Sequence, residues 1–477
     1  MDYSFEKFTF CSFDPRDLAV HVLFFRPTGR ANVSVPSGKA LQIVGRSPPT
    51  GRGGQRIPPA RLVGMPIDIN FKILGLVNIN HLEYFRIPIW MEKIYIMKQT
   101  AIITGITGQD GSYLAEDLLE KGIRVFGGIR RSSSSNLSRI AHLIDHPDLN
   151  LIHFDLMDGC SIENFVRTVY DSVHTLIQFD NYIQVYNLAA QSHVGDSFNI
   201  PTVTHKVNAL GVITLLESLH KHFKKNFRFY QASTSELYGN GKNKRGRTKE
   251  MTEETPFNPV SPYAVSKMCA FLTVKNYRNA YGIHAVNGIL FNHESPRRGL
   301  DFVTRKITNY VARYALNKVE RNQPLQLGNL HAKRDWGDAR EYVRAMYMMI
   351  NDAKDEAITD YVVATGDTYS VKSFAETAFR KIGVALDWSG TGERTKATNR
   401  NSKEEVLIEV NKNLYRPIDI NQLLGNPAKI EANLQWKSTV SIKQLISDMV
   451  DNDIEILKHD KTDYKKRAYD AAMRTSS

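Results

Sequence analysis

Residues 100–122 read TAIITGITGQDGSYLAEDLLEKG, and this stretch decides the fold. Its first five residues form an apolar, β-branched run that is typical of a buried parallel strand. Leu114 and Leu118 then recur four positions apart, which predicts one face of a helix, and Gly122 supplies its stop. The run IRVFGGI at 123–129 predicts a second strand. Strand, glycine turn, helix and strand make a βαβ unit, so we expect an α/β fold with a doubly wound parallel sheet.

Three glycines, Gly105, Gly108 and Gly111, lie between the first strand and the helix in a G-x-x-G-x-x-G spacing. Such a spacing lets the backbone approach a pyrophosphate at the positive end of a helix. Three glycines alone also fit an ordinary tight turn, and it is the βαβ context that favours a dinucleotide site. The sequence therefore predicts a Rossmann-type domain, followed by a smaller C-terminal substrate-binding domain.

The second predicted strand ends in RRSS at 130–133. A domain that binds NAD usually offers Asp or Glu here to the ribose 2′-hydroxyl, whereas two guanidinium groups and two hydroxyls suit a 2′-phosphate. Arginines after a strand are also often plain solvated surface. The pattern favours NADP as the cofactor. Later runs that end at Asp155 and at 188–192 predict further parallel strands that open into the same cleft.

The stretch SPYAVSK at 261–267 places Tyr263 and Lys267 four positions apart, hence on one face of a helix. A lysine ammonium beside a phenol favours phenolate, which makes tyrosine a usable base. The Tyr-x-x-x-Lys spacing alone is expected about once by chance in a chain of this composition. Its position downstream of the glycine motif, with the Ser/Thr-rich run QASTSELYGN at 231–240 between them, resembles the short-chain dehydrogenase/reductase superfamily. In that superfamily the residue at Thr234 would bind the substrate oxygen while Tyr263 moves its proton.

Glu236 needs a separate explanation, because alcohol oxidation requires no carboxylate. It follows Thr234 by two positions, which on a strand would place both side chains on the same face. A carboxylate facing the substrate can remove a carbon-bound proton once a neighbouring ketone has acidified it. That is the logic of a dehydratase: oxidation at C4, proton removal at C5, water loss from C6 and hydride return to C6. The alternative is that Glu236 only pairs with a nearby lysine or caps a turn.

From about residue 98 to about residue 455 the sequence resembles the GDP-mannose 4,6-dehydratase family, through GITGQDGSYLAEDLLEKG, NLAAQSHV, QASTSELYG, SPYAVSK and NGILFNHESPRRG. The resemblance implies a lyase that converts GDP-mannose to GDP-4-dehydro-6-deoxy-mannose with bound NADP, as a homodimer or homotetramer. One rival is another nucleotide-sugar dehydratase or 4-epimerase, but an epimerase needs no C5 base. The other is a dinucleotide-binding protein without catalysis, which the intact Thr, Glu, Tyr and Lys set disfavours.

The resemblance also assigns site residues. The catalytic ones would be Thr234, Glu236, Tyr263 and Lys267. Those binding NADP would be Gly105, Ile106, Thr107, Gly108, Gln109, Asp110, Arg130, Arg131, Ser132, Ser133, Asp155, Leu156, Leu188, Ala189, Ala190, Gln191, Ser192, Lys267, His293 and Arg298. Those facing the nucleotide sugar would be Asn292, Arg334 and Arg416. No metal is expected.

The composition of the 477-residue chain limits its possible partners, its location and its division into domains. The net charge of +12 is scattered rather than striped, so we expect no nucleic acid partner. There is no apolar run long enough for a membrane span. Three cysteines without paired spacing indicate a reducing, cytoplasmic location. We expect residues 1–97 to be an atypical, poorly ordered extension, 98–290 an NADP-binding domain, and 291–477 mainly a nucleotide-sugar-binding domain.

Overall fold

The computed structural model describes residues 99–132, 136–177, 182–240, 250–319, 323–351 and 358–458. These residues belong to one compact unit, Lys98–Ser477. The predictions made for residues 1–97 and for Ser133 lie outside the described residues.

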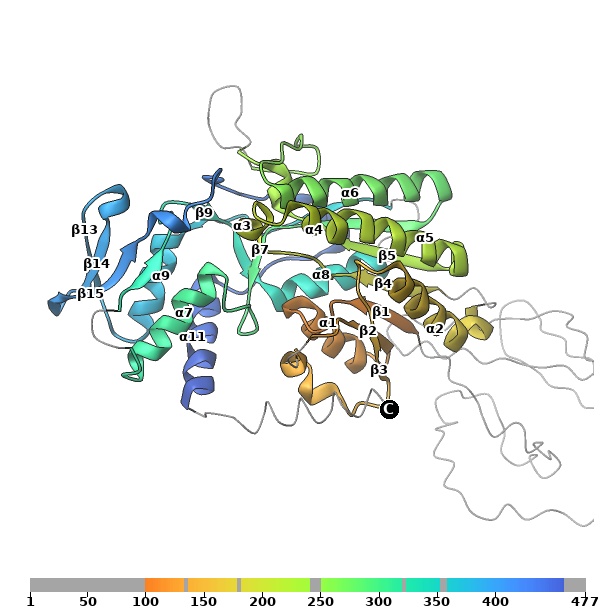
Figure 1. The fold of residues 1–477 in the computed structure, drawn as a ribbon, viewed down its shortest axis with the longest axis horizontal. Coiled ribbons are helices and arrows are strands. Elements are labelled where there is room, and N and C mark those ends of the chain that lie inside the picture. Colours follow the sequence, from red (N-terminus) through yellow and green to blue (C-terminus); the bar gives the residue numbers. More distant parts are fainter. Residues whose placement is uncertain are drawn as a thin grey trace, which may run out of the picture. The chain divides into compact units, whose positions relative to one another are not determined.

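A seven-stranded parallel sheet forms the centre of this unit, in the order β11-β6-β5-β4-β1-β2-β3. Figure 1 labels β1 to β5 of this sheet. The strands are β1 (Thr100–Thr104), β2 (Arg124–Ile129), β3 (Leu149–His153), β4 (Ile183–Asn187), β5 (Phe227–Ala232), β6 (His284–Leu290) and β11 (Tyr361–Val363). β1 pairs with β2 on one side and with β4 on the other, so the strand order reverses there. Sheets of this kind bind ligands at the carboxyl ends of the strands beside such a reversal. The predicted fold class is confirmed.

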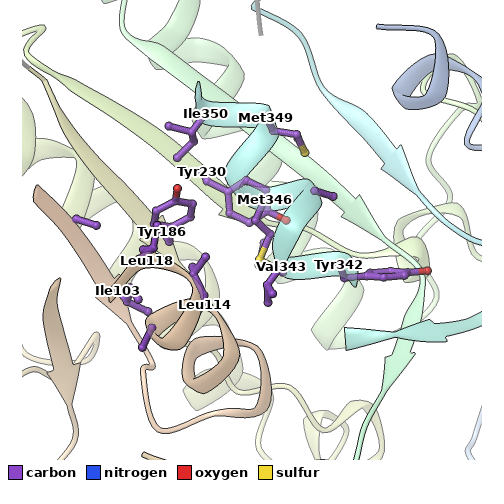
Figure 2. Close-up of a cluster of buried hydrophobic side chains, with 14 of the residues drawn as sticks. Ile103, Leu114, Leu118, Tyr186, Tyr230, Tyr342, Val343, Met346, Met349 and Ile350 are labelled. Atoms are coloured by element: carbon purple, nitrogen blue, oxygen red, sulfur yellow. The ribbon is translucent and has the colours of Figure 1, made fainter. Parts of the chain in front are cut away.

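Helices cover both faces of the sheet, which is why all five residues of β1 are apolar or small and buried. α1 (Gln109–Glu120) and α8 (Ala339–Asn351) pack on one face. Figure 2 shows the cluster of buried side chains between them, with Leu114 and Leu118 of α1 facing Met346 of α8. α2 (Gly159–Ile177), α5 (Gly211–Phe223) and α6 (Pro262–Tyr281) pack on the other face.

Local sequence signals explain where the two helices nearest the site begin and end. α6 starts after Ser261, whose Oγ accepts a hydrogen bond from the amide of Ala264 at 3.1 Å, and Pro262 is its first residue. It ends at Gly282, whose φ of 62° is the left-handed conformation that suits glycine. α1 ends before Gly122, also left-handed with φ of 73°. The predicted stop is therefore confirmed.

A second core lies in the C-terminal part of the chain. A four-stranded sheet in the order β13-β14-β15-β8 packs with α7, α9 and α11 around Trp336, Phe374 and Met449. Its elements are β8 (Leu325–Leu327), β13 (Leu386–Ser389), β14 (Lys396–Asn399), β15 (Ser402–Val410), α7 (Val303–Ala315), α9 (Val371–Lys381) and α11 (Ile442–Lys458). β11 and α8, although they also come after residue 290, join the first sheet, so the chain crosses between the two cores several times.

Short elements complete the fold around the site. They are α3 (Val194–Ser197), α4 (Pro201–His205), η6 (Lys206–Leu210), β7 (Asn292–Glu294), β9 (Lys333–Arg334), β10 (Trp336–Asp338), β12 (Tyr369–Ser370) and α10 (Ala428–Leu434), with short turns of helix at η4 (Leu137–Arg139), η5 (Ala141–Leu143), η7 (Ser235–Tyr238), η9 (Gly392–Arg394) and η10 (Lys412–Leu414). Within the described ranges, no helix combines the length and the apolar character needed to cross a membrane. The same residues contain no His, Cys, Asp and Glu cluster placed to hold a metal ion.

Candidate active site

A cavity of about 720 Å³ opens at the carboxyl ends of the parallel strands and extends to the C-terminal core. Its wall includes most of the residues predicted from sequence: Gly105, Thr107, Gly108, Gln109, Asp110, Arg130, Asp155, Leu156, Leu188, Ala189, Ala190, Ser192, Thr234, Glu236, Tyr263, Lys267, Asn292, His293, Arg298, Arg334 and Arg416. Four other described residues of the predicted set, Ile106, Arg131, Ser132 and Gln191, are not part of that wall. The structure therefore brings the expected glycine turn, catalytic set and arginines to one cavity.

The glycine turn fits a pyrophosphate by its shape. Gly105 has φ of 70°, and a Cβ there would lie 2.9 Å from the backbone nitrogen of Ala189. A Cβ on Gly111 would lie 2.4 Å from the carbonyl oxygen of Gly105. Only glycine leaves this backbone uncovered at the start of α1, where unpaired amides and the helix dipole favour an anion. The turn can therefore hold the diphosphate of a dinucleotide.

Arg139 also lines the cavity, and the sequence analysis missed it. It lies on η4, donates from Nε to the carbonyl of Arg297 at 2.7 Å and from Nη1 to the carbonyl of Thr107 at 3.2 Å. Burial lowers the pKa of its guanidinium, and three nearby arginines lower it further. Arg139 thus adds positive charge next to the glycine turn. No spacing motif links it to the RRSS run, so only the tertiary structure identifies it.

Thr234 and Glu236 both reach the cavity, but not as residues on one strand. β5 ends at Ala232, and Thr234 caps the start of η7, with its Oγ1 accepting a hydrogen bond from the amide of Glu236 at 3.2 Å. The expectation that the two share a strand face was wrong, because the chain leaves the sheet after the amide of Ser233 bonds to Gly288. A turn of helix, rather than strand alternation, brings the hydroxyl and the carboxylate together.

Tyr263 and Lys267 lie on the first turns of α6, as predicted, and both are buried. The Lys267 Nζ donates to the carbonyl of Ala232 at 2.9 Å and lies 6.0 Å from the centre of the Tyr263 ring. Burial lowers the pKa of Lys267 to about 8. Burial also raises the pKa of Tyr263 to about 12, although a hydrogen bond with Thr234 opposes that rise. Burial therefore makes Tyr263 a weaker acid than a free phenol, which is the opposite of the lowering expected from the neighbouring lysine.

The His293 ring contacts Asp110 in the first turn of α1, with His293 Nε2 2.9 Å from Asp110 Oδ2. The other ring nitrogen, Nδ1, lies 2.7 Å from the carbonyl oxygen of Phe291. Burial lowers the pKa of His293, but the charge and hydrogen bond of Asp110 outweigh burial and raise the pKa above its ordinary value. Burial raises the pKa of Asp110, and its interactions with His293 reverse that effect and lower it.

Two arginines lie near the Glu236 carboxylate in the cavity wall. Arg416 Nη1 lies 3.7 Å from Glu236 Oε1, and the Arg416 side chain is 34% exposed. Arg334 is buried and donates to the carbonyl of Ile420 at 2.8 Å, with Asp419 Oδ1 3.4 Å away. Burial lowers the pKa of Arg334, and the Glu236 carboxylate raises it. Within the described ranges, Glu236 therefore pairs with an arginine rather than with the lysine of the alternative interpretation, and Arg416 is the more accessible of the two arginines.

A glycine turn at the reversal of a parallel sheet, with Thr, Tyr and Lys on one cavity, defines a dinucleotide-dependent enzyme of the short-chain dehydrogenase/reductase class. Solved structures of this class have a similar fold. The dTDP-glucose 4,6-dehydratase of Bacillus anthracis, in complex with NAD, has a TM-score of 0.58 at 19% identity, covering 76% of this chain and 98% of that one. RMD from Pseudomonas aeruginosa, complexed with NADPH, has a TM-score of 0.55 at 20% identity, covering 75% and 99%.

The sequence profile of the GDP-mannose 4,6 dehydratase family matches residues 102–449. GDP-mannose 4,6 dehydratase 2 of Caenorhabditis elegans is 43% identical over 376 residues, which are 77% of this chain and 92% of that protein. GDP-mannose 4,6 dehydratase of Homo sapiens is 42% identical over 372 residues, 76% of this chain and 93% of that protein. The chain belongs to the GDP-mannose 4,6 dehydratase family, which confirms the resemblance found in the sequence.

Proposed function

We propose that this chain dehydrates GDP-mannose to GDP-4-dehydro-6-deoxy-mannose with NADP as its resident cofactor. The observation that carries the proposal is the convergence of Thr234, Glu236 and Tyr263 on one cavity, next to a glycine turn whose shape fits a dinucleotide. Relatives named GDP-mannose 4,6 dehydratase that align over most of their own length support the substrate. When bound, NADP would supply a hydride acceptor for C4 in its oxidised form, the same hydride for C6 in its reduced form, and a positively charged ring while it is oxidised.

Each catalytic side chain has one task in this scheme. Tyr263 accepts the proton of the C4 hydroxyl, and Thr234 hydrogen-bonds the same oxygen. The Lys267 ammonium and the positive ring together favour the phenolate that burial alone disfavours. Glu236 then removes the C5 proton, which the new C4 ketone has acidified, and gives that proton to the departing C6 hydroxyl, which leaves as water. A 4-epimerase needs no such base, and the position of Glu236 in the cavity favours the dehydratase.

We assign the remaining wall residues to the two ligands. The glycine turn holds the pyrophosphate of NADP, and Arg130 is the wall residue placed for its 2′-phosphate. The segments around Asp155 and Leu188 enclose the rest of the cofactor. Asn292, Arg334 and Arg416 face the nucleotide sugar, where guanidinium groups suit a diphosphate. Of these three, Arg416 has the donors most open to a ligand, because most Arg334 donors already meet protein oxygens.

A panel of nucleotide sugars tests this function. The purified chain with NADP is incubated with GDP-mannose, dTDP-glucose, UDP-glucose and GDP-glucose, and the products are followed by mass. We expect loss of water from GDP-mannose and little or none from the others. Loss of water from another member of the panel in preference to GDP-mannose would contradict the substrate. A change of sugar configuration without loss of water would contradict the dehydratase.

We also propose a homodimer or homotetramer. Leu210 of η6 and Val265 and Leu272 of α6 are large apolar residues, 57%, 41% and 51% exposed, on neighbouring helices. Burial of such a patch against a second copy would remove this apolar surface from water. Light scattering should then give a mass of at least two chains, and a monomer would contradict the proposal. A cytoplasmic location fits the exposed free thiols of Cys160 and Cys269, and cell fractionation would test it.

A further inference from the structure

The His293 side chain has a hydrogen-bond acceptor at each ring nitrogen: the Asp110 carboxylate at 2.9 Å and the Phe291 carbonyl at 2.7 Å. A neutral imidazole carries one N–H, so only the imidazolium can donate to both. We infer that His293 is a buried imidazolium that neutralises Asp110 beside the pyrophosphate turn and thereby makes dinucleotide affinity depend on pH. The inference deepens the proposed function, because it rests on that turn binding NADP.

The place of Asp110 explains why its charge matters. Asp110 lies in the first turn of α1, where a carboxylate is favoured by the helix dipole. The same end of the helix is where the pyrophosphate would bind, and a second anion there would repel it. The two side chains of the pair are only 11% and 21% exposed, so solvent screens the charge weakly. A protonated His293 makes the pair neutral and removes the repulsion.

Further contacts fix the pair in this position. The Gln109 Nε2 donates to Asp110 Oδ1 at 3.0 Å and to the carbonyl of His293 at 3.1 Å. Ser295 Oγ donates to Gln109 Oε1 at 2.8 Å. The His293 ring stacks on Tyr342 of α8 with ring centres 4.7 Å apart. These bonds join β7 to the start of α1, so His293 positions the turn through Asp110 and does not need to touch the cofactor itself.

Other ionisable groups face the pair from several elements, and their effects must be counted. Arg298, which follows β7, lowers the pKa of both partners, and its own guanidinium is 3.1 Å from Glu294. The negative charge of Asp110 also raises the pKa values of three neighbouring groups, Lys267 and Tyr263 on α6 and Tyr230 on β5. With all of these present, the pKa of His293 is raised and that of Asp110 is lowered.

The sign of the pH dependence follows from the raised pKa of His293. Below that pKa the imidazolium is present and the pair is neutral. As pH rises through it, the proton is lost, one of the two ring hydrogen bonds is lost, and Asp110 is left as an uncompensated anion. Dinucleotide affinity should therefore fall as pH rises through the raised pKa of His293, and binding above it should take up a proton.

The affinity of NADH, which lacks a titrating 2′-phosphate, is measured by calorimetry from about pH 6 to about pH 9. In the unmodified protein we expect affinity to fall about tenfold across this range. His293→Gln should bind NADH about tenfold more weakly at the acid end and lose the part of the decline that is due to His293. Lys267, whose pKa is about 8, loses its charge in the same range and adds a decline that all the variants share. Adding Asp110→Asn to His293→Gln should restore the affinity, because the uncompensated charge is gone. His222→Gln is the matched control. His222 Nε2 lies 2.8 Å from Glu163 Oε1, outside the cavity, so its loss should leave the NADH affinity and its pH dependence unchanged.

Two results would overturn the inference: a double variant that binds no more tightly than His293→Gln, or a His293→Gln variant with the pH profile of the unmodified protein. NMR titration of the His293 ring decides its protonation even if a variant folds poorly. We expect a pKa above the ordinary value of about 6.5, and a neutral ring at that pH would refute the imidazolium. If the unmodified protein binds no dinucleotide, the proposed function fails, while the NMR titration still decides the charge of His293.

Discussion

Asp335 offers a prediction whose size follows from the structure. The residue is fully buried between two members of the cavity wall, Arg334 and Trp336. Its carboxylate accepts hydrogen bonds from the amide and hydroxyl of Thr365 at 2.9 and 2.7 Å and from the amide of Gly366 at 3.0 Å. Burial nevertheless raises its pKa from 3.8 to about 6. The ionised carboxylate is therefore less stable in the folded protein than in the unfolded chain.

The raised pKa of Asp335 determines whether its contribution to folding stability rises or falls with pH. A folded pKa above the unfolded value gives a contribution to stability that is full below about pH 3.8 and lost as pH rises through about 6. The difference between the two pKa values corresponds to about 3 kcal/mol of unfolding free energy. Asp335→Asn keeps one carbonyl acceptor but cannot titrate, so its own cost should not vary with pH. The variant should be least stable relative to the unmodified protein at the acid end.

Urea unfolding of both proteins at intervals from about pH 4 to about pH 7 measures this difference. We expect the disadvantage of Asp335→Asn to shrink by about 2.5 kcal/mol between about pH 4 and about pH 7. Thr365→Val removes one hydrogen bond that lowers the pKa of Asp335. In that variant the stabilising contribution of protonated Asp335 should therefore persist to higher pH. A difference that stays flat, or that grows with pH, would refute the reasoning.

Three further predictions concern the ligands. Gly111→Ala places a Cβ 2.4 Å from a backbone oxygen and should weaken NADP at least about tenfold in calorimetry, whereas Gly122→Ala, with open space around the new Cβ, should leave NADP affinity unchanged. Replacing Arg130, the wall residue assigned to the 2′-phosphate, with Ala removes a charge-assisted bond worth about 1.5 to 3 kcal/mol, so NADP affinity should fall at least about tenfold while NAD is nearly unaffected. Equal affinity of the unmodified protein for both cofactors would contradict this. Arg416→Ala should raise KM for the nucleotide sugar about tenfold, and an unchanged KM would remove Arg416 from the substrate site.

Local signals in the sequence were enough to predict the secondary-structure elements that carry the site. The apolar run at 100–104, the glycine spacing and the periodicity of the following helix predict the first βαβ unit, because each depends on neighbouring residues. The N-cap Ser261 and Pro262 likewise place Tyr263 at the start of a helix. Local rules are therefore reliable where hydrogen bonds and burial involve residues within a few positions of one another.

Features that depend on tertiary contacts could not be predicted in this way. The hydrogen bond between Asp110 and His293 joins residues 183 positions apart, and that between Asp335 and Thr365 spans 30. Arg139 lies on the short helical turn η4, which carries no motif, and its role follows only from its place beside the glycine turn. The end of β5 at Ala232 depends on a neighbouring strand, so alternation gave the wrong geometry for Glu236.

The central claim is that oxidation and elimination are performed by different side chains in one cavity. Glu236→Gln tests it, since glutamine keeps the size of the side chain but cannot act as the C5 base. GDP-mannose is added to this variant holding oxidised NADP, in heavy water. Reduced nicotinamide is followed by absorbance, dehydrated product by mass, and deuterium at C5 by NMR. Tyr263→Phe, which removes the proposed C4 base, serves as the comparison.

We expect Glu236→Gln to show the absorbance of reduced nicotinamide but almost no dehydrated product and almost no deuterium at C5. Turnover should fall by about 10² to 10⁴, the usual contribution of a positioned base, or by more. Tyr263→Phe should block even the absorbance change. If Glu236→Gln exchanges the C5 hydrogen at the rate of the unmodified protein, Glu236 is not the base and the account of this cavity is wrong.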